Sequence, residues 1–346
     1  MTTLASRDTS TAGAATEQVD RLAGLAVTPD AVRSALALLA GVVHRTPLLR
    51  SSTLDACVGA NVFSKAENLQ RSGSFKIRGA LHRLLTLSPE EQSHGVVAFS
   101  SGNHAQGVAL AARIVGMRAT IVMPTDAPQV KRQATIDYGA TIVDYDRATE
   151  DREALAARIV AEQGGTVVPP FNDHGVITGQ GTVGLEIAQQ LRAQNIVPDV
   201  ALVPVGGGGL ASGVAIALID AFPRIRIVGV EPASADDARQ SLAAGAIVKI
   251  DQPVTIADGV ATQSVGTLTF PILQAVLDDI VTVSEAELIR ALRFVLERLK
   301  QVVEPTGALT TAALLEKRVD ATGKVVVSIL CGGNLDLDVL ARLNNR

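Results

Sequence analysis

Residues 200–219 read VALVPVGGGGLASGVAIALI. The apolar run 200–205 is typical of a buried strand, and the apolar residues after the glycines are typical of a helix. The stretch is uncharged and long enough to span a membrane, but Pro204 and the glycines 206–209 would interrupt such a helix. A strand, a glycine loop and a helix in succession instead predict one unit of an α/β fold.

The same alternation of strands and helices continues on both sides of this stretch. Strands are expected at 96–99, 119–123, 141–143, 166–168, 200–205, 225–230 and 325–330. Helices are expected at 29–43, 105–115, 129–138 and 152–163. The alternation predicts βαβ units and a mostly parallel sheet, with the ligand site at the carboxyl ends of its strands.

Composition and charge narrow the class of protein. The chain has 346 residues, 47% hydrophobic and 3% aromatic, enough for two domains or one large α/β unit around a core of aliphatic side chains. A net charge of -4 gives no electrostatic basis for binding nucleic acid or an anionic membrane. Two cysteines, Cys57 and Cys331, favour a reducing cytoplasm. Residues 1–28 lack the apolar segment of a secretion signal and are expected to form a flexible tail.

The glycines 206–209 allow two interpretations. Gly206-x-Gly208-x-x-Ala211 follows a strand, opens a helix and precedes a second strand that ends at Glu231. This pattern is typical of a dinucleotide-binding unit with an acid on the ribose, so an NAD(P)-dependent oxidoreductase is one hypothesis. The other is a phosphate site, because four consecutive glycines at the start of a helix enclose a small phosphate more closely than a dinucleotide requires.

Two further segments have no function in an oxidoreductase. Lys76 lies in SGSFKIRGA at 72–80, and SSGNH at 100–104 follows an expected strand. A lysine amine can hold an aldehyde as a Schiff base, the glycine loop can hold a phosphate, and the remaining loop can orient a carboxylate. Together they favour an enzyme that uses pyridoxal 5'-phosphate (PLP), with a non-catalytic PLP-binding protein as a further alternative.

Several motifs in this order resemble the serine/threonine dehydratase and serine racemase family, PLP enzymes of the tryptophan-synthase-β-like fold (type II). They are HRTPL at 44–48, SGSFKIRGA at 72–80, SSGNHAQ at 100–106, the glycines 206–209, EPT at 304–306 and CGGN at 331–334. The resemblance implies two open, mostly parallel twisted sheets with flanking helices, in a large and a small domain with the cofactor between them. The large domain is expected at 29–94 and 173–346, and the small domain at 95–172.

The resemblance also implies roles for the motif residues. Lys76 would hold the cofactor aldehyde and then act as the base at the substrate Cα, with Phe75 packed near the cofactor. Asn103 would hydrogen-bond the pyridine 3′-oxygen, and Cys331 would face the ring nitrogen. A thiol does not keep that nitrogen protonated, which weakens the electron sink and favours prompt loss of a β-hydroxyl. The other expected contacts are Gly206, Gly207, Gly208, Gly209, Leu210 and Glu304 for the cofactor, and Ser100, Ser101, Gly102, Asn103 and His104 for the substrate carboxylate.

Two side chains allow more than one reaction or substrate. Ser101 resembles the serine that acts on the opposite cofactor face in serine racemases, so racemisation could accompany elimination. Arg152 aligns with an arginine near the substrate pocket of serine racemase and could bind a second carboxylate, as in 3-hydroxyaspartate. It could equally pair with Glu150 or Asp151 on a solvated helix face.

A metal site is also expected from the resemblance. Glu231, the Ala235 carbonyl and Asp237 match the divalent-cation site of serine racemase. Two carboxylates and a backbone oxygen suit Mg²⁺ or Ca²⁺. The alternative is a solvated loop in which these acids bind nothing.

The sequence therefore predicts a cytoplasmic PLP-dependent ammonia-lyase that converts L-threonine or L-serine to a 2-oxo acid and ammonia. Serine racemase and 3-hydroxyaspartate dehydratase are the alternatives within the family. Twelve residues, 335–346, follow the last motif, so no C-terminal regulatory domain is expected. The expected partners are a small amino-acid substrate and further copies of the chain, as a dimer or tetramer, without nucleic acid or membrane.

Overall fold

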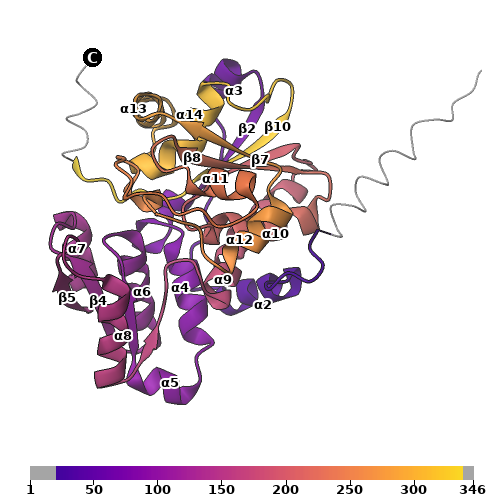
Figure 1. Ribbon diagram of the computed structural model, residues 1–346. Coiled ribbons are helices and arrows are strands. Elements are labelled where there is room, and N and C mark those ends of the chain that lie inside the picture. Colours follow the sequence, from indigo (N-terminus) through magenta and orange to yellow (C-terminus); the bar gives the residue numbers. More distant parts are fainter. Residues whose placement is uncertain (1–20, 338–346) are drawn as a thin grey trace, which may run out of the picture.

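Two sheets organise the chain in a computed structural model, which describes residues 21–337 (Figure 1). The larger sheet has the strand order β1-β2-β10-β7-β8-β9. Neighbouring strands are parallel except for β1 and β2, which are antiparallel. The strands are β1 (Leu48–Leu49), β2 (Asn61–Ala66), β7 (Val200–Pro204), β8 (Arg226–Pro232), β9 (Asp279–Val283) and β10 (Val325–Leu330). Segments from both ends of the chain therefore meet in one sheet.

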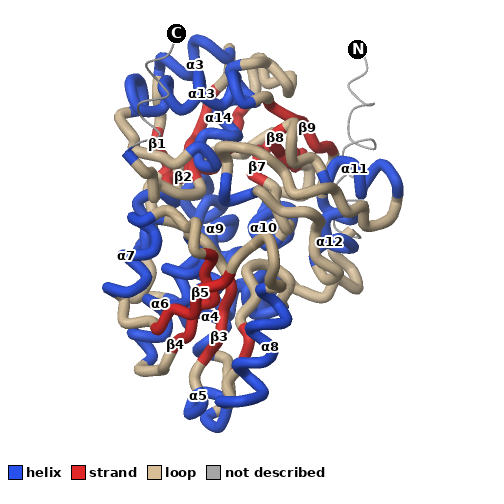
Figure 2. The backbone as a smooth tube through the Cα atoms, turned by 60° about the vertical axis from the view of Figure 1, so that its left-hand side comes forward, coloured by secondary structure: helices blue, strands red, loops and turns tan. Residues whose placement is uncertain are grey.

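The smaller sheet is built from a single stretch of the chain. Its four strands are all parallel, in the order β5-β4-β3-β6. They are β3 (Val96–Phe99), β4 (Ala119–Pro124), β5 (Thr141–Tyr145) and β6 (Thr166–Val167). Figure 2 shows β3, β4 and β5 in the lower part of the molecule and β7, β8 and β9 in the upper part. The smaller unit is thus an insertion between β2 and β7 of the larger one.

Helices flank both sheets (Figure 2). They are α2 (Pro29–Leu39), α3 (Ser52–Val58), α4 (Lys76–Leu85), α5 (Pro89–His94), α6 (Asn103–Val115), α7 (Gln129–Asp137), α8 (Arg152–Gln163), α9 (His174–Arg192), α10 (Gly209–Ala221), α11 (Asp237–Ala244), α12 (Thr269–Val276), α13 (Glu285–Phe294) and α14 (Leu309–Leu315). Helix α4 packs against α6 of the smaller unit and against α9 of the larger one. The first turn of α4, which carries Lys76, therefore lies at the junction of the two units.

The predicted α/β fold with two mostly parallel sheets is confirmed. Strands β3 and β10 coincide with the expected runs, whereas β2 and β9 were not expected from the sequence. The helix expected at 29–43 ends at Leu39, because Ala40 leaves the helical region with a ψ of 136°. The exact domain boundaries stay a prediction.

The flexible tail expected at residues 1–28 can be compared with the structure only at residues 21–28. Residues 1–20 lie outside the described part of the chain. Residues 21–28 pack against the larger unit: Val27 is buried, and Arg21 forms an ion pair of 3.1 Å with Asp278. These contacts fix the segment that leads into α2.

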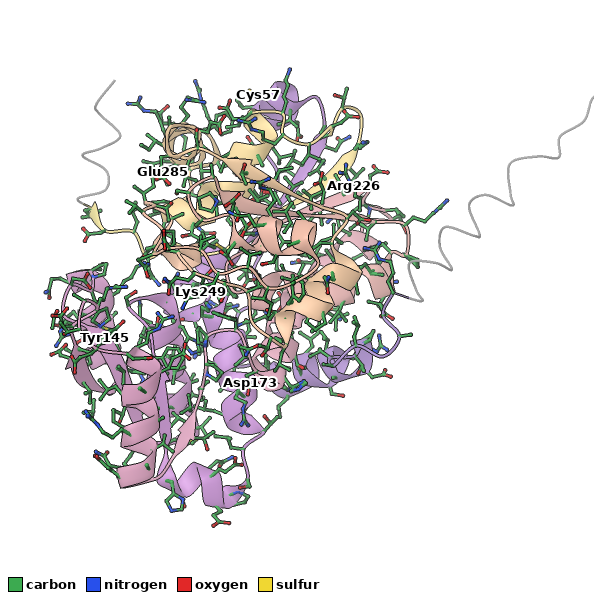
Figure 3. The ribbon with its side chains drawn as sticks, viewed as in Figure 1. Cys57, Tyr145, Asp173, Arg226, Lys249 and Glu285 are labelled. Carbon is green, nitrogen blue, oxygen red and sulfur yellow. The ribbon has the colours of Figure 1, made fainter. Side chains whose placement is uncertain are left out.

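Two further expectations concern the membrane and the cysteines. Within residues 21–337, no helix combines the length and the apolarity that crossing a bilayer requires. Both cysteines are free thiols: Cys57 is exposed at the outer edge of the larger unit, where Figure 3 labels it, and Cys331 is buried.

Candidate active site

A cavity of about 180 Å³ lies where the two units meet. Loops at the carboxyl ends of β3, β7 and β10 form much of its wall, as expected for a ligand site in parallel sheets. Apart from the metal ligands, all of the site residues expected from the sequence line this one cavity. They are Phe75, Lys76, Ser100, Ser101, Gly102, Asn103, His104, Arg152, Gly206, Gly207, Gly208, Gly209, Leu210, Glu304 and Cys331.

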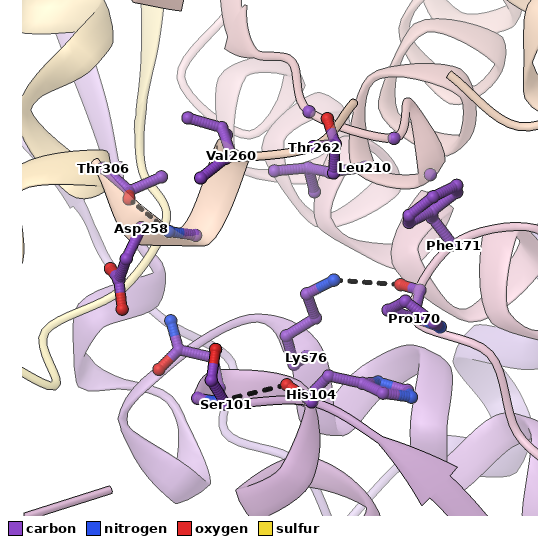
Figure 4. Close-up of a pocket in the computed structure, with 18 of the residues that line it drawn as sticks. Lys76, Ser101, His104, Pro170, Phe171, Leu210, Asp258, Val260, Thr262 and Thr306 are labelled. Carbon is purple, nitrogen blue, oxygen red and sulfur yellow. Dashed lines mark hydrogen bonds between the residues drawn. The ribbon is translucent and has the colours of Figure 1, made fainter. Parts of the chain in front are cut away.

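Lys76 presents its amine to the cavity. Its Nζ donates a hydrogen bond of 2.9 Å to the Pro170 carbonyl oxygen (Figure 4). Burial lowers the pKa of Lys76 to about 8, while the charge of Glu304 acts in the opposite direction. On the order of a tenth of the amine is then neutral at pH 7, far more than for a solvated lysine. Lys76 is therefore able to attack an aldehyde and to accept a proton.

The backbone that carries Lys76 is fixed on two sides. The Phe75 N–H donates to the Cys331 carbonyl at 3.2 Å, which ties this segment to the end of β10. Two residues after Lys76, the fully buried Arg78 contacts Glu67 at 2.8 Å and Glu186 on α9 at 2.7 Å. Breaking a buried ion network of this kind is strongly destabilising, so the start of α4 is held firmly.

The glycines 206–209 form a closely packed turn from β7 into α10. Gly208 has a φ of +91°, in the left-handed region, and a Cβ on Gly207 would overlap the Phe171 ring. No side chain caps the N-terminus of α10, whose first N–H groups are free to bind an anion. The absence of side chains and the helix N-terminus together fit a phosphate group.

The SSGNH segment forms the loop between β3 and α6. The Ser100 Oγ accepts a hydrogen bond of 3.1 Å from the Gly102 N–H, and α6 begins at Asn103. His104 faces inward, and its Nε2 lies 2.8 Å from the Val168 carbonyl oxygen. Burial lowers the pKa of His104 to about 3, so its imidazole is neutral and cannot serve as a cation for a carboxylate. The loop offers hydroxyls and a helix N-terminus instead.

Asn103 and Glu304 are linked directly. The Asn103 Nδ2 donates a hydrogen bond to the Glu304 Oε1, and the Asn103 Oδ1 accepts one of 2.9 Å from the Asn334 Nδ2. The two contacts fix which end of the amide is the donor. Asn103 thus presents its nitrogen, and not its oxygen, on the side of Glu304.

Cys331 follows β10 and is buried at the cavity wall. Burial is the main reason that the pKa of its thiol is raised well above the usual value. The thiol is therefore neutral at physiological pH. A neutral thiol is neither a nucleophile nor a counter-ion for a protonated pyridine.

Two arginines reach the same cavity from the segment before and at the start of α8. Arg152 places its guanidinium 5.3 Å from the centroid of the Phe99 ring, a favourable cation–π distance. Arg147 forms an ion pair of 2.7 Å with Asp126, and both members of that pair are substantially exposed. The cavity therefore has cationic groups beyond those that a PLP phosphate and one carboxylate require.

The residues expected to bind a metal lie elsewhere, around the turn from β8 to α11. Glu231 is buried and accepts hydrogen bonds from the Ala238 N–H at 3.0 Å and the Arg239 N–H at 2.9 Å. Burial raises the pKa of Asp237 to about 7 and, with the charge of Asp237, raises that of Glu231. Residues 21–337 contain no group of three or more acidic, histidine or cysteine side chains arranged to hold a metal. Glu231 does not line the cavity, which removes it as the ribose-binding acid of a dinucleotide site.

The cavity is also lined by residues that were not identified from the sequence, among them Lys131, Arg147, Phe171 and Asp258. None of these four lies in a recognisable motif, and each is brought to the cavity by the packing of one unit against the other.

Comparison with known proteins agrees with this geometry. An L-threo-3-hydroxyaspartate ammonia-lyase from Pseudomonas sp is 48% identical over 88% of this chain and 94% of its own length. A threonine deaminase structure from T.th. has a TM-score of 0.85 at 46% identity, over 89% of this chain and 99% of that one. A maize serine racemase structure has a TM-score of 0.87 at 41% identity, over 92% of this chain and 96% of that one.

The family itself follows from a match along most of the chain. Residues 39–332 match the sequence profile of the family described as pyridoxal-phosphate dependent enzyme. The nicotinamide hypothesis is thereby set aside, and the predicted resemblance is confirmed. This chain belongs to the family of pyridoxal-phosphate dependent enzymes.

Proposed function

We propose that the protein is an ammonia-lyase that removes water from a β-hydroxy amino acid, after which the released enamine becomes an imine and takes up water to yield a 2-oxo acid and ammonia. The observation that carries the proposal is the convergence, in one cavity, of the Lys76 amine, a phosphate-sized glycine turn and a hydroxyl-bearing loop. When bound, PLP would supply an electron sink for the electrons of a broken bond at the substrate Cα.

Different residues of the chain would bind the cofactor, bind the substrate and transfer the proton. The glycines 206–209 and the N-terminus of α10 would hold the phosphate, and the segment 100–102 would hold the substrate carboxylate. Lys76 would hold the aldehyde and then remove the proton at Cα, for which its lowered pKa suits it. The neutral Cys331 would leave the pyridine nitrogen without a counter-ion, which favours prompt loss of the β-hydroxyl over a long-lived carbanion.

Among β-hydroxy amino acids, we favour 3-hydroxyaspartate over L-threonine and L-serine as the substrate. The two arginines support this order, because a dicarboxylic substrate carries one carboxylate more than the SSGNH loop can bind, and guanidinium groups bind carboxylates bidentately. The Pseudomonas relative, 48% identical, bears the name of an enzyme acting on the L-threo isomer. A panel of 2-oxo acid release from L-threonine, L-serine, D-serine and the 3-hydroxyaspartate isomers tests the order, and a higher kcat/KM for L-threonine would reverse it.

The arginines provide the first specific prediction. Arg152→Ala and Arg147→Ala are each expected to lower kcat/KM for 3-hydroxyaspartate by about 10-fold to 100-fold, because a hydrogen bond to a charged group contributes about 1.5–3 kcal/mol. The value for L-serine, which lacks the second carboxylate, should change less than about threefold. Arg158→Ala on the exposed face of α8 is the matched control. Equal losses for both substrates would show that the arginines support the fold of the loop and not the substrate.

Ser101 provides the second prediction. Racemisation and dehydration both begin with loss of the Cα proton, and Ser101 is expected to matter mainly for racemisation. Lys76 can remove the proton from an L-amino acid whether or not Ser101 is present. Return of a proton on the opposite face needs a donor there, and Ser101 is proposed as that donor. Ser101→Ala should therefore abolish any L-to-D conversion of serine, while dehydration falls no more than about tenfold, the loss of one supporting hydrogen bond. Chiral chromatography of serine beside a 2-oxo acid assay measures both, and racemisation that survives in the variant would contradict the assignment.

A divalent cation at Glu231, Ala235 and Asp237 is retained as part of the proposal. The Asp237 Oδ2 is buried without a hydrogen-bond partner among the described residues, next to a second buried carboxylate. A hard cation such as Mg²⁺ or Ca²⁺ would compensate both charges. A homo-oligomeric state and a cytoplasmic location likewise remain predictions.

A further inference from the structure

Lys131 forms an ion bridge across the cavity. It lies on α7 of the smaller unit, and only 3% of its side chain is exposed. Its Nζ lies 2.6 Å from the Asp258 Oδ2 and 3.1 Å from the Glu304 Oε2, and both acids belong to the larger unit. All three residues line the cavity. The elimination reaction proposed above assigns no function to the buried Lys131 ammonium.

The two acids depend on Lys131 to different degrees. The Asp258 side chain is 38% exposed, so water can solvate its charge if the lysine is lost. The Glu304 side chain is 2% exposed, and an unpaired carboxylate there would be costly. Burial raises the pKa of Glu304, and the Lys131 ammonium is the strongest influence in the opposite direction. Loss of the Lys131 ammonium would therefore raise the pKa of Glu304 further.

The charge state of Glu304 matters because its other oxygen binds Asn103. The Asn103 Nδ2 carries two protons, and one of them is donated to the Glu304 Oε1. The second remains available to a group in the cavity. A protonated Glu304 can itself be a hydrogen-bond donor. It would then no longer favour the Asn103 amide nitrogen over the amide oxygen as its partner.

The backbone at Gly332 packs closely against this contact. A Cβ on Gly332 would overlap the Glu304 Oε1 and lie 3.0 Å from the Asn103 Nδ2, so only glycine fits beside the pair. The Glu304 N–H donates to the Gly332 carbonyl at 3.1 Å. The carboxylate therefore keeps its place, and its ionisation is the variable that remains.

We propose that Lys131 is a positioning residue for the cofactor: its ion pair holds the Glu304 carboxylate, and Glu304 in turn holds Asn103 with its second N–H available to the 3′-oxygen of PLP. The inference rests on the proposed function and on the family resemblance, which implies that Asn103 would hydrogen-bond the 3′-oxygen of the cofactor. Lys131 acts through two other side chains and does not itself touch the reacting atoms.

The test begins with Lys131→Met, which removes the charge and keeps most of the side-chain volume. The dissociation constant of PLP, from titration of the cofactor-free protein, is expected to rise about tenfold, the effect of weakening one hydrogen bond. The ratio of visible to near-ultraviolet absorbance of the bound cofactor should also change, because that ratio reports the state of the 3′-oxygen. Arg132→Met, on the same helix but paired with Asp144 at the surface, should change neither quantity.

A double-mutant cycle shows whether the effect passes through Glu304. Glu304→Gln mimics the protonated acid and should reproduce the absorbance change of Lys131→Met. The double variant should then be no worse than the poorer single variant by more than about threefold, because the two residues act in series. Asp258→Asn removes the other ion pair of the same lysine and should leave the absorbance ratio unchanged. If Lys131→Met does not fold, Glu304→Gln alone still tests the step.

The outcomes separate this inference from the proposed function. Wild-type protein that binds no PLP would overturn the proposed function. Wild-type protein with a normal cofactor spectrum, together with an unchanged spectrum and affinity in Lys131→Met or in Glu304→Gln, would overturn only the role of Lys131. Fully additive effects in the double variant would equally show that Lys131 does not act through Glu304.

Discussion

Lys76→Ala is expected to form no covalent adduct with PLP and to lose at least about 10⁴ in kcat, the upper part of the contribution of a positioned acid–base group. The substitution removes both the tether and the base, because the amine at the cavity is the group that would hold the aldehyde and take the Cα proton. Absorbance of the bound cofactor and release of 2-oxo acid measure the two losses separately.

A matched control distinguishes this loss from a general effect of removing a lysine. Lys324→Ala removes an amine that pairs with Asp320 at the surface, and it should retain full cofactor content and activity. Free cofactor could still enter the cavity of Lys76→Ala and bind through its phosphate. A cofactor adduct that borohydride still reduces in Lys76→Ala would contradict the assignment.

Gly207→Asp is expected to raise the dissociation constant of PLP at least about 100-fold, through overpacking and through charge repulsion of the phosphate. A Cβ at this position would already overlap the Phe171 ring, so the turn must open before any side chain fits. The aspartate then adds a negative charge at the N-terminus of α10, where the phosphate dianion is expected.

The neutral isostere separates the two causes. The asparagine of Gly207→Asn has nearly the same shape as aspartate but no charge. Its dissociation constant for PLP should therefore be at least about tenfold lower than that of Gly207→Asp. Titration of both cofactor-free variants with PLP gives the comparison. Equal affinities for the two variants would show that the phosphate does not lie beside this glycine.

The strands that were predicted correctly are those whose own residues form a recognisable apolar run. The runs at β3 and β10 are short, apolar and fully or nearly buried, so local pattern and tertiary position agree. Strand β2 was missed because it contains Ser64 and Lys65. Lys65 is fully buried, and its charge is compensated by Glu186, 121 residues further along the chain. No local pattern can reveal a partner at that distance in sequence.

In the candidate site, too, residues in sequence motifs could be predicted, and residues brought in by tertiary packing could not. Motif residues such as Lys76 and Asn103 could be assigned to one site because several motifs of one family occur in order, and the structure places them around one cavity. Lys131 and Asp258 belong to no motif, and their interaction exists only because α7 faces the larger unit across the cavity. His104 stays a predicted member of the carboxylate-binding loop, and its ring is buried, neutral and in contact with the Val168 carbonyl oxygen. Residue type alone could not predict that environment.

The central claim is that Lys76 and bound PLP convert a β-hydroxy amino acid to a 2-oxo acid and ammonia. The most direct measurement is the amount of both products formed from 3-hydroxyaspartate, L-serine and L-threonine by the holoenzyme, before and after reduction with borohydride. We predict equal amounts of 2-oxo acid and ammonia from at least one substrate, no product after reduction, and a reduced pyridoxyl group on the peptide that contains Lys76. A holoenzyme that carries PLP on Lys76 but releases neither product from any of the three substrates would contradict the account.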